Sequence, residues 1–152
     1  MSGKQGRRRE FLLPALAAPI SHYCDAVRFD DTLYISGIPP LDLEGRVVSE
    51  DPAAQARQVF ENMKVVLDAA GATFADVLKV TVYLTDVDDR PKINPVRQEY
   101  FGAARPASTP TGVKQRSNPG TSGEIAAVVG LPGDWRAATP GWGKVWTSGM
   151  PW

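Results

Sequence analysis

Cysteine and histidine are the scarcest chemically active residues in this chain of 152 residues, which contains one of each, Cys24 and His22. A single cysteine excludes a disulfide bond within the chain. The two residues form no zinc-ligand pattern, so we expect no metal and no cofactor. Low cysteine use is typical of a reducing compartment, and we therefore expect a cytoplasmic protein.

The chain also lacks an excess of charge and a long apolar run. Its 17 Lys and Arg residues balance its 17 Asp and Glu residues, which leaves a formal net charge of zero. Without a net positive field to attract phosphates, we expect no nucleic-acid partner. No run approaches the roughly 18 to 20 apolar residues of a membrane span, so we expect no membrane contact. The composition, with 43% hydrophobic and 22% charged residues, is that of an ordinary globular domain.

The one basic run, Arg7–Arg9, precedes a short apolar stretch, as in a twin-arginine export signal. Ala15–Ala17 matches the small residues of a cleavage site. The apolar stretch contains Pro14, however, and it runs directly into the first predicted element of the fold. We therefore interpret residues 1–17 as a flexible basic N-terminal segment and keep an export signal as the alternative.

The length fits one domain with one hydrophobic core, which we place at residues 18–132. Residues 133–152 differ in composition, because they are rich in glycine and proline and hold all four tryptophans of the chain. This tail has no hydrophobic periodicity. Such a segment either packs on a surface or stays loose.

Two short β-branched and apolar runs, Ala26–Phe29 and Thr32–Ser36, flank two aspartates, and this pattern predicts a β-hairpin. A long helix is expected next, because Asp51 supplies an N-cap oxygen, Pro52 suits a first helical turn and Gly71 favours a stop. Apolar residues at intervals of three and four predict one buried helix face. They are Ala56, Val59, Phe60, Met63, Val66, Leu67 and Ala70.

Residues Val77–Thr85 alternate in the manner of a strand. One face, predicted to meet the helix, carries Leu78, Val80, Val82 and Leu84, and the other carries Lys79, Thr81, Tyr83 and Thr85.

A second helix is expected to end at Phe101, before Gly102. Its start is open, because Asp89 and Asn94 are both N-cap candidates, and Pro95 predicts a restart or kink near Asn94. The last two predicted strands are Ser108–Val113 and Gly123–Val129. The predicted order is β-β-α-β-α-β-β, an α+β fold.

Several segments, in order and correctly spaced over about residues 18–132, resemble the Rid/YjgF (RidA-like) family. They are Ser36-Gly37, Ala54-Gln55-Ala56-Arg57-Gln58, Ala69-Ala70-Gly71, Val80-Thr81-Val82-Tyr83-Leu84, Asn94 and Arg105-Pro106-Ala107-Ser108-Thr109. The resemblance implies a chorismate-mutase-like (YjgF-like) subunit, a homotrimer with strands packed into a central barrel, and small-molecule sites in the intersubunit clefts. The first described members deaminate enamines and imines such as 2-aminoacrylate. A monomeric sheet with one solvated face is the alternative architecture.

In the deaminating members, an arginine on the strand after the second helix binds the substrate carboxylate through two hydrogen bonds, and Ser108 occupies that position here. A serine offers one uncharged hydroxyl in place of two charge-assisted bonds, each worth on the order of 1.5 to 3 kcal/mol. We therefore expect 2-aminoacrylate to be handled poorly. Arg97, Arg105 and Lys114 are the cations considered as substitutes, and the alternative for each is a solvated surface charge.

The resemblance matches Glu124 to the family glutamate that positions or deprotonates the hydrolytic water. A carboxylate in a partly apolar cleft has a raised pKa, which suits proton transfer. The alternative is a surface glutamate on an edge strand. Tyr23 and Asn94 match residues that orient the substrate, but a tyrosine in the core and an asparagine that only caps a helix would explain them equally well.

His22 replaces the proline that usually precedes Tyr23, and it is the only imidazole available for acid–base catalysis. A structural role is its alternative. Cys24 is interpreted as a small buried hydrophobe, unless the neighbouring imidazole activates its thiol. Ser36 and Gly37 offer backbone donors to a ligand oxyanion, or only end a strand.

We therefore expect a RidA-like hydrolase that deaminates or tautomerises an enamine, imine or related C–N compound, with Glu124 steering water or a proton. A trimeric protein that binds or protects a metabolite without turnover is the second hypothesis, which Ser108 favours. A ribonuclease-like translation inhibitor is the third, and zero net charge argues against it.

Overall fold

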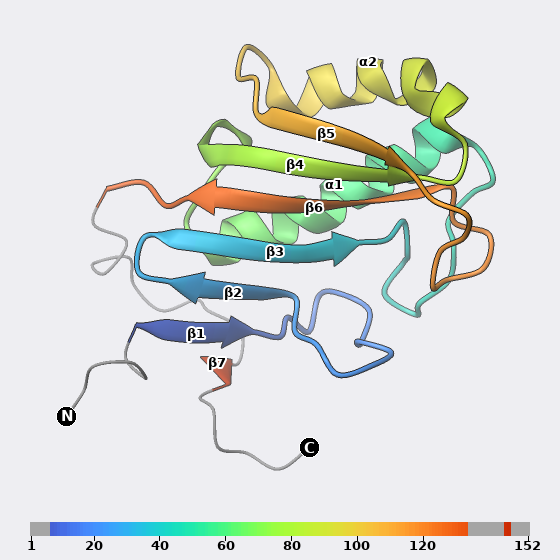
Figure 1. Ribbon diagram of the computed structural model, residues 1–152. Helices are drawn as coiled ribbons and strands as arrows, with labels where there is room; N and C mark the ends of the chain where they lie inside the picture. Colours follow the sequence, from blue (N-terminus) through green and yellow to red (C-terminus); the bar gives the residue numbers. More distant parts are fainter. Residues whose placement is uncertain (1–6, 134–144, 147–152) are drawn as a thin grey trace.

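The computed structural model describes residues 7–133 and residues 145–146. They form a seven-stranded sheet in the order β5-β4-β6-β3-β2-β1-β7. Two helices, α1 (Pro52–Ala69) and α2 (Arg90–Phe101), cover one face of this sheet (Figure 1). The described residues therefore confirm the predicted α+β class.

The predicted hairpin is confirmed as β2 (Ala26–Phe29) and β3 (Thr32–Ile38), whose turn contains Asp30 with a φ of 50°. An additional strand, β1 (Arg8–Phe11), pairs antiparallel with β2, and β7 (Val145–Trp146) pairs with β1. The interpretation of residues 8–11 as part of a flexible segment is therefore wrong. The buried side chain of Phe11 holds this strand on the core.

Except for β7 and residue 133, the predicted C-terminal tail lies outside the described residues.

The long helix α1 begins and ends close to the predicted residues. The Asp51 side chain accepts a hydrogen bond from the backbone N–H of Ala54 at 2.9 Å, as an N-cap does, and Pro52 is the first helical residue. After the helix, Gly71 takes a φ of 71°, which glycine adopts without steric cost. The predicted apolar face is buried against the sheet.

The predicted restart of the second helix near Asn94 is wrong, because α2 is continuous with Pro95 inside it. A short 3₁₀ turn, η2 (Val87–Asp89), leads into the helix, so Asp89 occupies the N-cap position. Ile93 and Val96 are buried on either side of Pro95. We attribute the unbroken helix to this packing, which offsets the missing proline N–H.

Strand β4 (Val77–Leu84) lies between β5 (Ala107–Gly112) and β6 (Gly123–Gly130). β5 runs parallel to β4 and β6 runs antiparallel to it. β6 is therefore an inner strand, and the alternative that placed Glu124 on an edge strand is wrong.

The alternation predicted for β4 holds from Val80 onward but fails at Leu78, which is 57% exposed. The pairing of β4 with β6 shifts register between Val77 and Lys79. This irregularity turns Val77 into the core in place of Leu78. The alternation of apolar and polar residues in the sequence does not reveal such a local register shift.

No helix covers the second face of the sheet within the described residues (Figure 1). This open face carries Phe29 and Tyr34, which are 40% and 52% exposed. Strand β5, at one edge of the sheet, also has exposed side chains along most of its length. None of the described helices combines the length and the apolar character needed to cross a lipid bilayer.

Candidate functional site

A pocket of about 440 Å³ opens beside Glu124. Four predicted site residues line this Glu124 pocket: Tyr23 from the loop before β2, Ser36 and Gly37 from β3, and Glu124 from β6. The antiparallel pairing of β3 with β6 brings these elements side by side. The resemblance therefore located four residues that the fold does bring together.

The Glu124 carboxylate lies directly against the backbone of β3. The register of β3 with β6 is irregular between Ile35 and Ile38, and Gly37 falls in this interval. A Cβ atom added at Gly37 would lie 2.6 Å from Oε1 of Glu124. Glycine at this position is therefore required for the observed placement of the carboxylate.

Ser36 is held by its own hydrogen bond. Its hydroxyl donates to the carbonyl oxygen of Cys24 at 2.6 Å. Because a hydroxyl carries one proton and two lone pairs, the donated proton leaves the Ser36 oxygen as an acceptor toward a ligand.

Glu124 forms an ion pair with Arg116, a residue of the loop between β5 and β6 that does not itself line the pocket. The two side chains are only 20% and 9% exposed. The Arg116 guanidinium lies over the Tyr83 ring at 5.2 Å from its centroid. Burial lowers the pKa of Arg116, although a guanidinium stays protonated in proteins.

A buried cation beside a carboxylate favours the ionised carboxylate. The surroundings of Glu124 therefore differ from the partly apolar cleft expected from the sequence, because Arg116 supplies a neighbouring charge of opposite sign.

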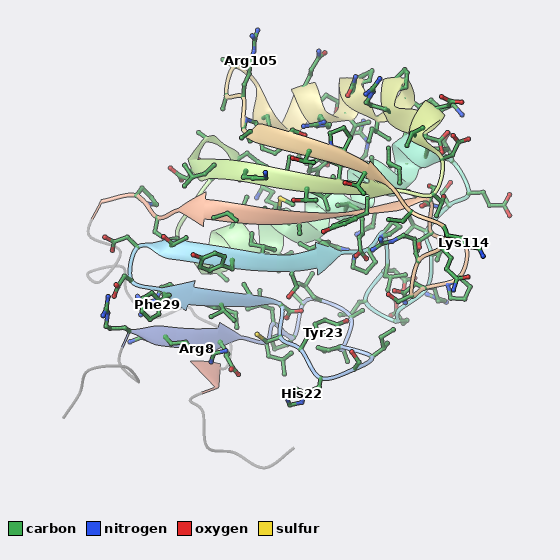
Figure 2. The ribbon with its side chains drawn as sticks, in the orientation of Figure 1. Arg8, His22, Tyr23, Phe29, Arg105 and Lys114 are labelled. Atoms are coloured by element: carbon green, nitrogen blue, oxygen red, sulfur yellow. The ribbon has the colours of Figure 1, made fainter. Side chains whose placement is uncertain are left out.

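The other predicted residues of this region differ in their exposure and contacts. Tyr23 is 38% exposed, so its alternative as a core residue is wrong. His22 is exposed and does not line the Glu124 pocket, and Figure 2 shows it at the outer end of its loop. The Cys24 thiol donates to the carbonyl oxygen of Ala26 at 3.4 Å, and burial raises its pKa, which keeps the thiol protonated.

A second pocket of about 500 Å³ lies at α2 and the segment that follows it. Asn94, Arg97 and Arg105 line this Arg97 pocket. Nη2 of Arg97 donates a hydrogen bond to Oγ of Ser108 at 3.0 Å, and burial lowers the pKa of Arg97. Arg97, one of the cations considered as a substitute for the family arginine, thus contacts Ser108.

Lys114 lies outside both pockets. It is exposed in the loop after β5, and Figure 2 shows it at the opposite end of that strand from Arg105.

The two pockets lie apart within one chain. Ser108 is opposite Val80 of β4, and Glu124 is opposite Tyr83 on the other side of the same strand. Two strand spacings and three residues along a strand separate their Cα atoms by about 14 Å. Val80 faces the helices, so Ser108 faces them too, whereas Tyr83 and Glu124 are on the open face.

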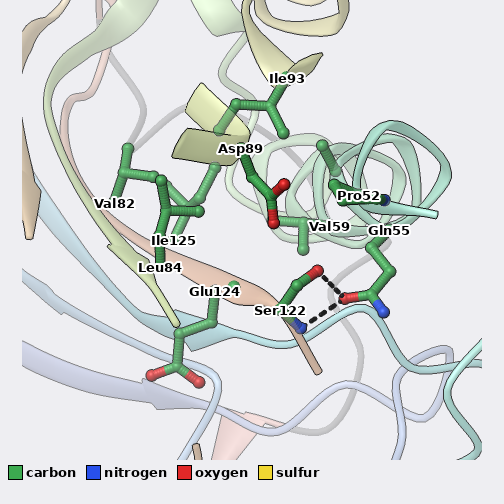
Figure 3. A pocket seen from close by; sticks show the side chains of 12 residues that line it. Pro52, Gln55, Val59, Val82, Leu84, Asp89, Ile93, Ser122, Glu124 and Ile125 are labelled. Atoms are coloured by element: carbon green, nitrogen blue, oxygen red, sulfur yellow. Dashed lines mark hydrogen bonds between the residues drawn. The ribbon is translucent and has the colours of Figure 1, made fainter. Parts of the chain in front are cut away.

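A third cavity, between α1 and the sheet, has a volume of only about 20 Å³, enough for about one water molecule (Figure 3). Gln55 lies at its edge and accepts hydrogen bonds from the backbone N–H and the hydroxyl of Ser122, both at 2.8 Å. Its amide donates to the carbonyl oxygen of Gly120 at 3.0 Å. Figure 3 shows the Glu124 carboxylate turned away from this cavity.

Arg116 and Gln55 are the residues of this region to which the sequence alone assigned no role. Gln55 belongs to a motif segment, but its partners on the distant loop follow only from the tertiary fold. Arg116 follows Lys114 by two positions, and only the loop conformation shows which of these two cations reaches Glu124. In the described part of the chain, no group of three or more His, Cys, Asp or Glu side chains is arranged to hold a metal ion.

Comparison with known proteins shows a match to the family described as Endoribonuclease L-PSP over residues 15–130. A similar protein is the 2-iminobutanoate/2-iminopropanoate deaminase of the mite Dermatophagoides farinae, with 34% identity over 71% of this chain and 85% of that protein. The 3-aminoacrylate deaminase RutC of Acinetobacter baylyi is 42% identical over 65% of this chain and 80% of its own length. The solved structure of RidA from an Antarctic Psychrobacter species has a TM-score of 0.72 and 32% identity, and the match covers 80% of this chain and 98% of that one.

Proposed function

Because the chain belongs to the Endoribonuclease L-PSP family, which includes RutC and RidA proteins, we propose that it is a Rid-like enzyme acting on an enamine, imine or related C–N compound. The names of the mite and Acinetobacter relatives support this class of substrate. The observation that carries the proposal is the Glu124 carboxylate in a pocket with Tyr23 and Ser36. The single cysteine supports a cytoplasmic location.

Glu124 acts in this proposal as the base that steers water or a proton. In hydrolysis, the carboxylate accepts a proton from water as the water oxygen bonds to the imine carbon. The nitrogen takes up two protons, one returned by Glu124 and one lost by the new hydroxyl group, the C–N bond breaks, and ammonia departs from the carbonyl product. An enamine first becomes the imine by tautomerisation, in which its carbon gains a proton and its nitrogen loses one. Tyr23 and Ser36 present polar groups that orient the substrate, and Gly37 allows the carboxylate its position.

Arg97 is the residue we assign to the substrate carboxylate, in place of the arginine that the family carries at Ser108. Its guanidinium contacts Ser108 and shares a pocket with Asn94 and Arg105. The bond to Ser108 uses one donor of Nη2, and a guanidinium has five donors in all, so a carboxylate has donors to meet.

The protein is proposed to work as a homotrimer in which the Glu124 pocket of one copy meets the Arg97 pocket of the next. The separation of about 14 Å and the opposite sheet faces argue for this arrangement, because a small imino acid cannot reach both pockets in one chain. The open face with Phe29 and Tyr34 supports burial against other copies.

A trimeric binding or protective protein without turnover is the second candidate. The observation that favours it is Ser108 at the position of the family arginine. The family description also names an endoribonuclease, but zero net charge favours a small molecule over RNA as the ligand.

Ammonia release separates these candidates. Short-lived enamines and imines, among them 2-aminoacrylate generated by a serine dehydratase, are produced in the assay with and without the protein. We expect the protein to speed ammonia release beyond the rate of spontaneous hydrolysis for at least one carboxylate-bearing compound. Binding of the carbonyl products without any acceleration would instead identify a binding protein.

A further inference from the structure

The ion pair of Arg116 with Glu124 joins a loop residue to the strand residue on which the proposed chemistry depends. Arg116 is 9% exposed although it belongs to a loop, where most charged side chains are solvated. Its Nε is buried and has no hydrogen-bond partner among the described residues. The described contacts that hold the guanidinium are therefore Glu124 and the Tyr83 ring.

The loop that carries Arg116 is itself tied to the helix layer. Gln55, 3% exposed on α1, binds the carbonyl oxygen of Gly120 and both polar groups of Ser122. These bonds hold the segment between Arg116 and Glu124 against a rigid helix. The backbone that leads from Arg116 to Glu124 is thus held at Gly120 and Ser122 by one side chain of α1.

We propose that Arg116 is a positioning residue that keeps Glu124 ionised and fixes one of its oxygens, so that the other oxygen accepts the proton in catalysis. The ion pair involves Oε1, which also lies closest to Gly37. Oε2 is left to face the substrate. This inference rests on the proposed role of Glu124 as the base. The ion pair would keep that base deprotonated as the pH falls.

Besides Arg116, the titratable groups in the described part of the chain that line the cavities around this carboxylate, or stand opposite Glu124 in the register of β4 with β6, are two tyrosines and two aspartates. Tyr83 is the register partner of Glu124 on β4, and Tyr23 lines the same pocket from the loop before β2. β3 contributes the uncharged Ser36 and Gly37. Asp25 and Ser36 line a further cavity of about 50 Å³, and Asp89 lines the cavity between α1 and the sheet.

Removal of Arg116 should therefore make Glu124 easier to protonate, because the two aspartates do not supply a positive charge. An opposite charge at close range lowers the titration midpoint of a carboxyl group by about 1 to 3 pH units. In Arg116→Gln, we expect the midpoint of Glu124 and the acid limb of the turnover profile to move upward together by about one unit or more.

The test combines two readouts on the full-length protein. Carbon-13 NMR of labelled glutamate carboxyl groups follows the Glu124 titration without any need for turnover, and Glu124→Gln identifies its signal. Turnover against pH gives the acid limb. Arg116→Lys retains a positive charge and should restore part of both shifts, even where Arg116→Gln folds poorly. Lys114→Gln removes an exposed charge two residues away and should change neither readout.

The outcomes are distinct. An unchanged Glu124 midpoint in a folded Arg116→Gln protein would overturn the proposal. A midpoint that rises while the acid limb stays in place would reject Glu124 as the base, and with it the proposed mechanism, but would uphold the ion pair as the control of its ionisation.

Discussion

The Glu124 pocket and the Arg97 pocket hold their charges in different ways. In the first, a carboxylate lies against the backbone of a glycine and pairs with a guanidinium that lies over an aromatic ring. In the second, a half-buried guanidinium of α2 rests on one neutral hydroxyl in a wide opening. A fixed, paired charge suits proton transfer at a set position, and a cation with no counterion among residues 7–133 suits binding of an anion.

Under the proposed function, the Glu124 pocket carries out the chemistry and the Arg97 pocket recognises the substrate. This division predicts that substitutions in the Glu124 pocket reduce turnover, whereas substitutions in the Arg97 pocket raise KM. The experiments below test this division, beginning with the largest expected effect.

Glu124→Gln should reduce turnover roughly 10²- to 10⁴-fold, because the amide keeps the shape of the side chain but is not a base. Affinity for a carbonyl product should change little. Steady-state rates and calorimetric binding measure the two effects, and Glu50→Gln, at an exposed position outside both pockets, is the matched control. Equal turnover in a folded variant would contradict the assignment.

Gly37→Ala should reduce turnover about 10²-fold, because the new Cβ displaces the Glu124 carboxylate. Gly130→Ala is the control, since its Cβ meets the flexible Leu78 side chain at 3.3 Å at the far end of β6. Thermal unfolding of both variants separates misplacement of the carboxylate from loss of the fold. A fully active Gly37→Ala protein would show that the close contact is not needed for catalysis.

Arg97→Gln should raise KM roughly 10- to 100-fold for a carboxylate-bearing substrate and leave kcat nearly unchanged, because a charge-assisted bond is lost. Arg90→Gln removes an exposed charge from the start of the same helix and should leave KM as it is. A fall in kcat without a change in KM would place Arg97 in the chemical step and remove the division between the pockets.

Sequence signals within a few residues of one another correctly predicted the hairpin and the long helix. The Asp51 cap, the paired aspartates of the hairpin and the helical periodicity of α1 all identified real boundaries. The resemblance also named Tyr23, Ser36, Gly37 and Glu124, which line one pocket, and Asn94, which lines the other. Strand β1 was missed because a basic run at the start of a chain has the composition of a tail, and only its pairing with β2 shows that Phe11 is buried.

The remaining features depend on contacts between distant segments. Leu78 was assigned to the wrong face because a register shift interrupts strand alternation. Arg116 was not identified because the path of its loop depends on bonds to Gln55, which lies more than sixty residues earlier in the chain. Spacing along the sequence carries no information on such a contact.

Complementation between two impaired proteins, one deficient in turnover and one in substrate binding, tests most directly whether the two pockets belong to one site shared by neighbouring copies. Glu124→Gln chains keep an intact Arg97 pocket, and Arg97→Gln chains keep an intact Glu124 pocket. In trimers assembled from an equal mixture of both, about one quarter of the intersubunit clefts would combine two unaltered pockets. At a substrate concentration below KM, we predict recovery of up to about a quarter of the unaltered activity in mixed trimers, which light scattering must show to be intact. Activity no higher than the average of the two parent proteins would contradict a shared site.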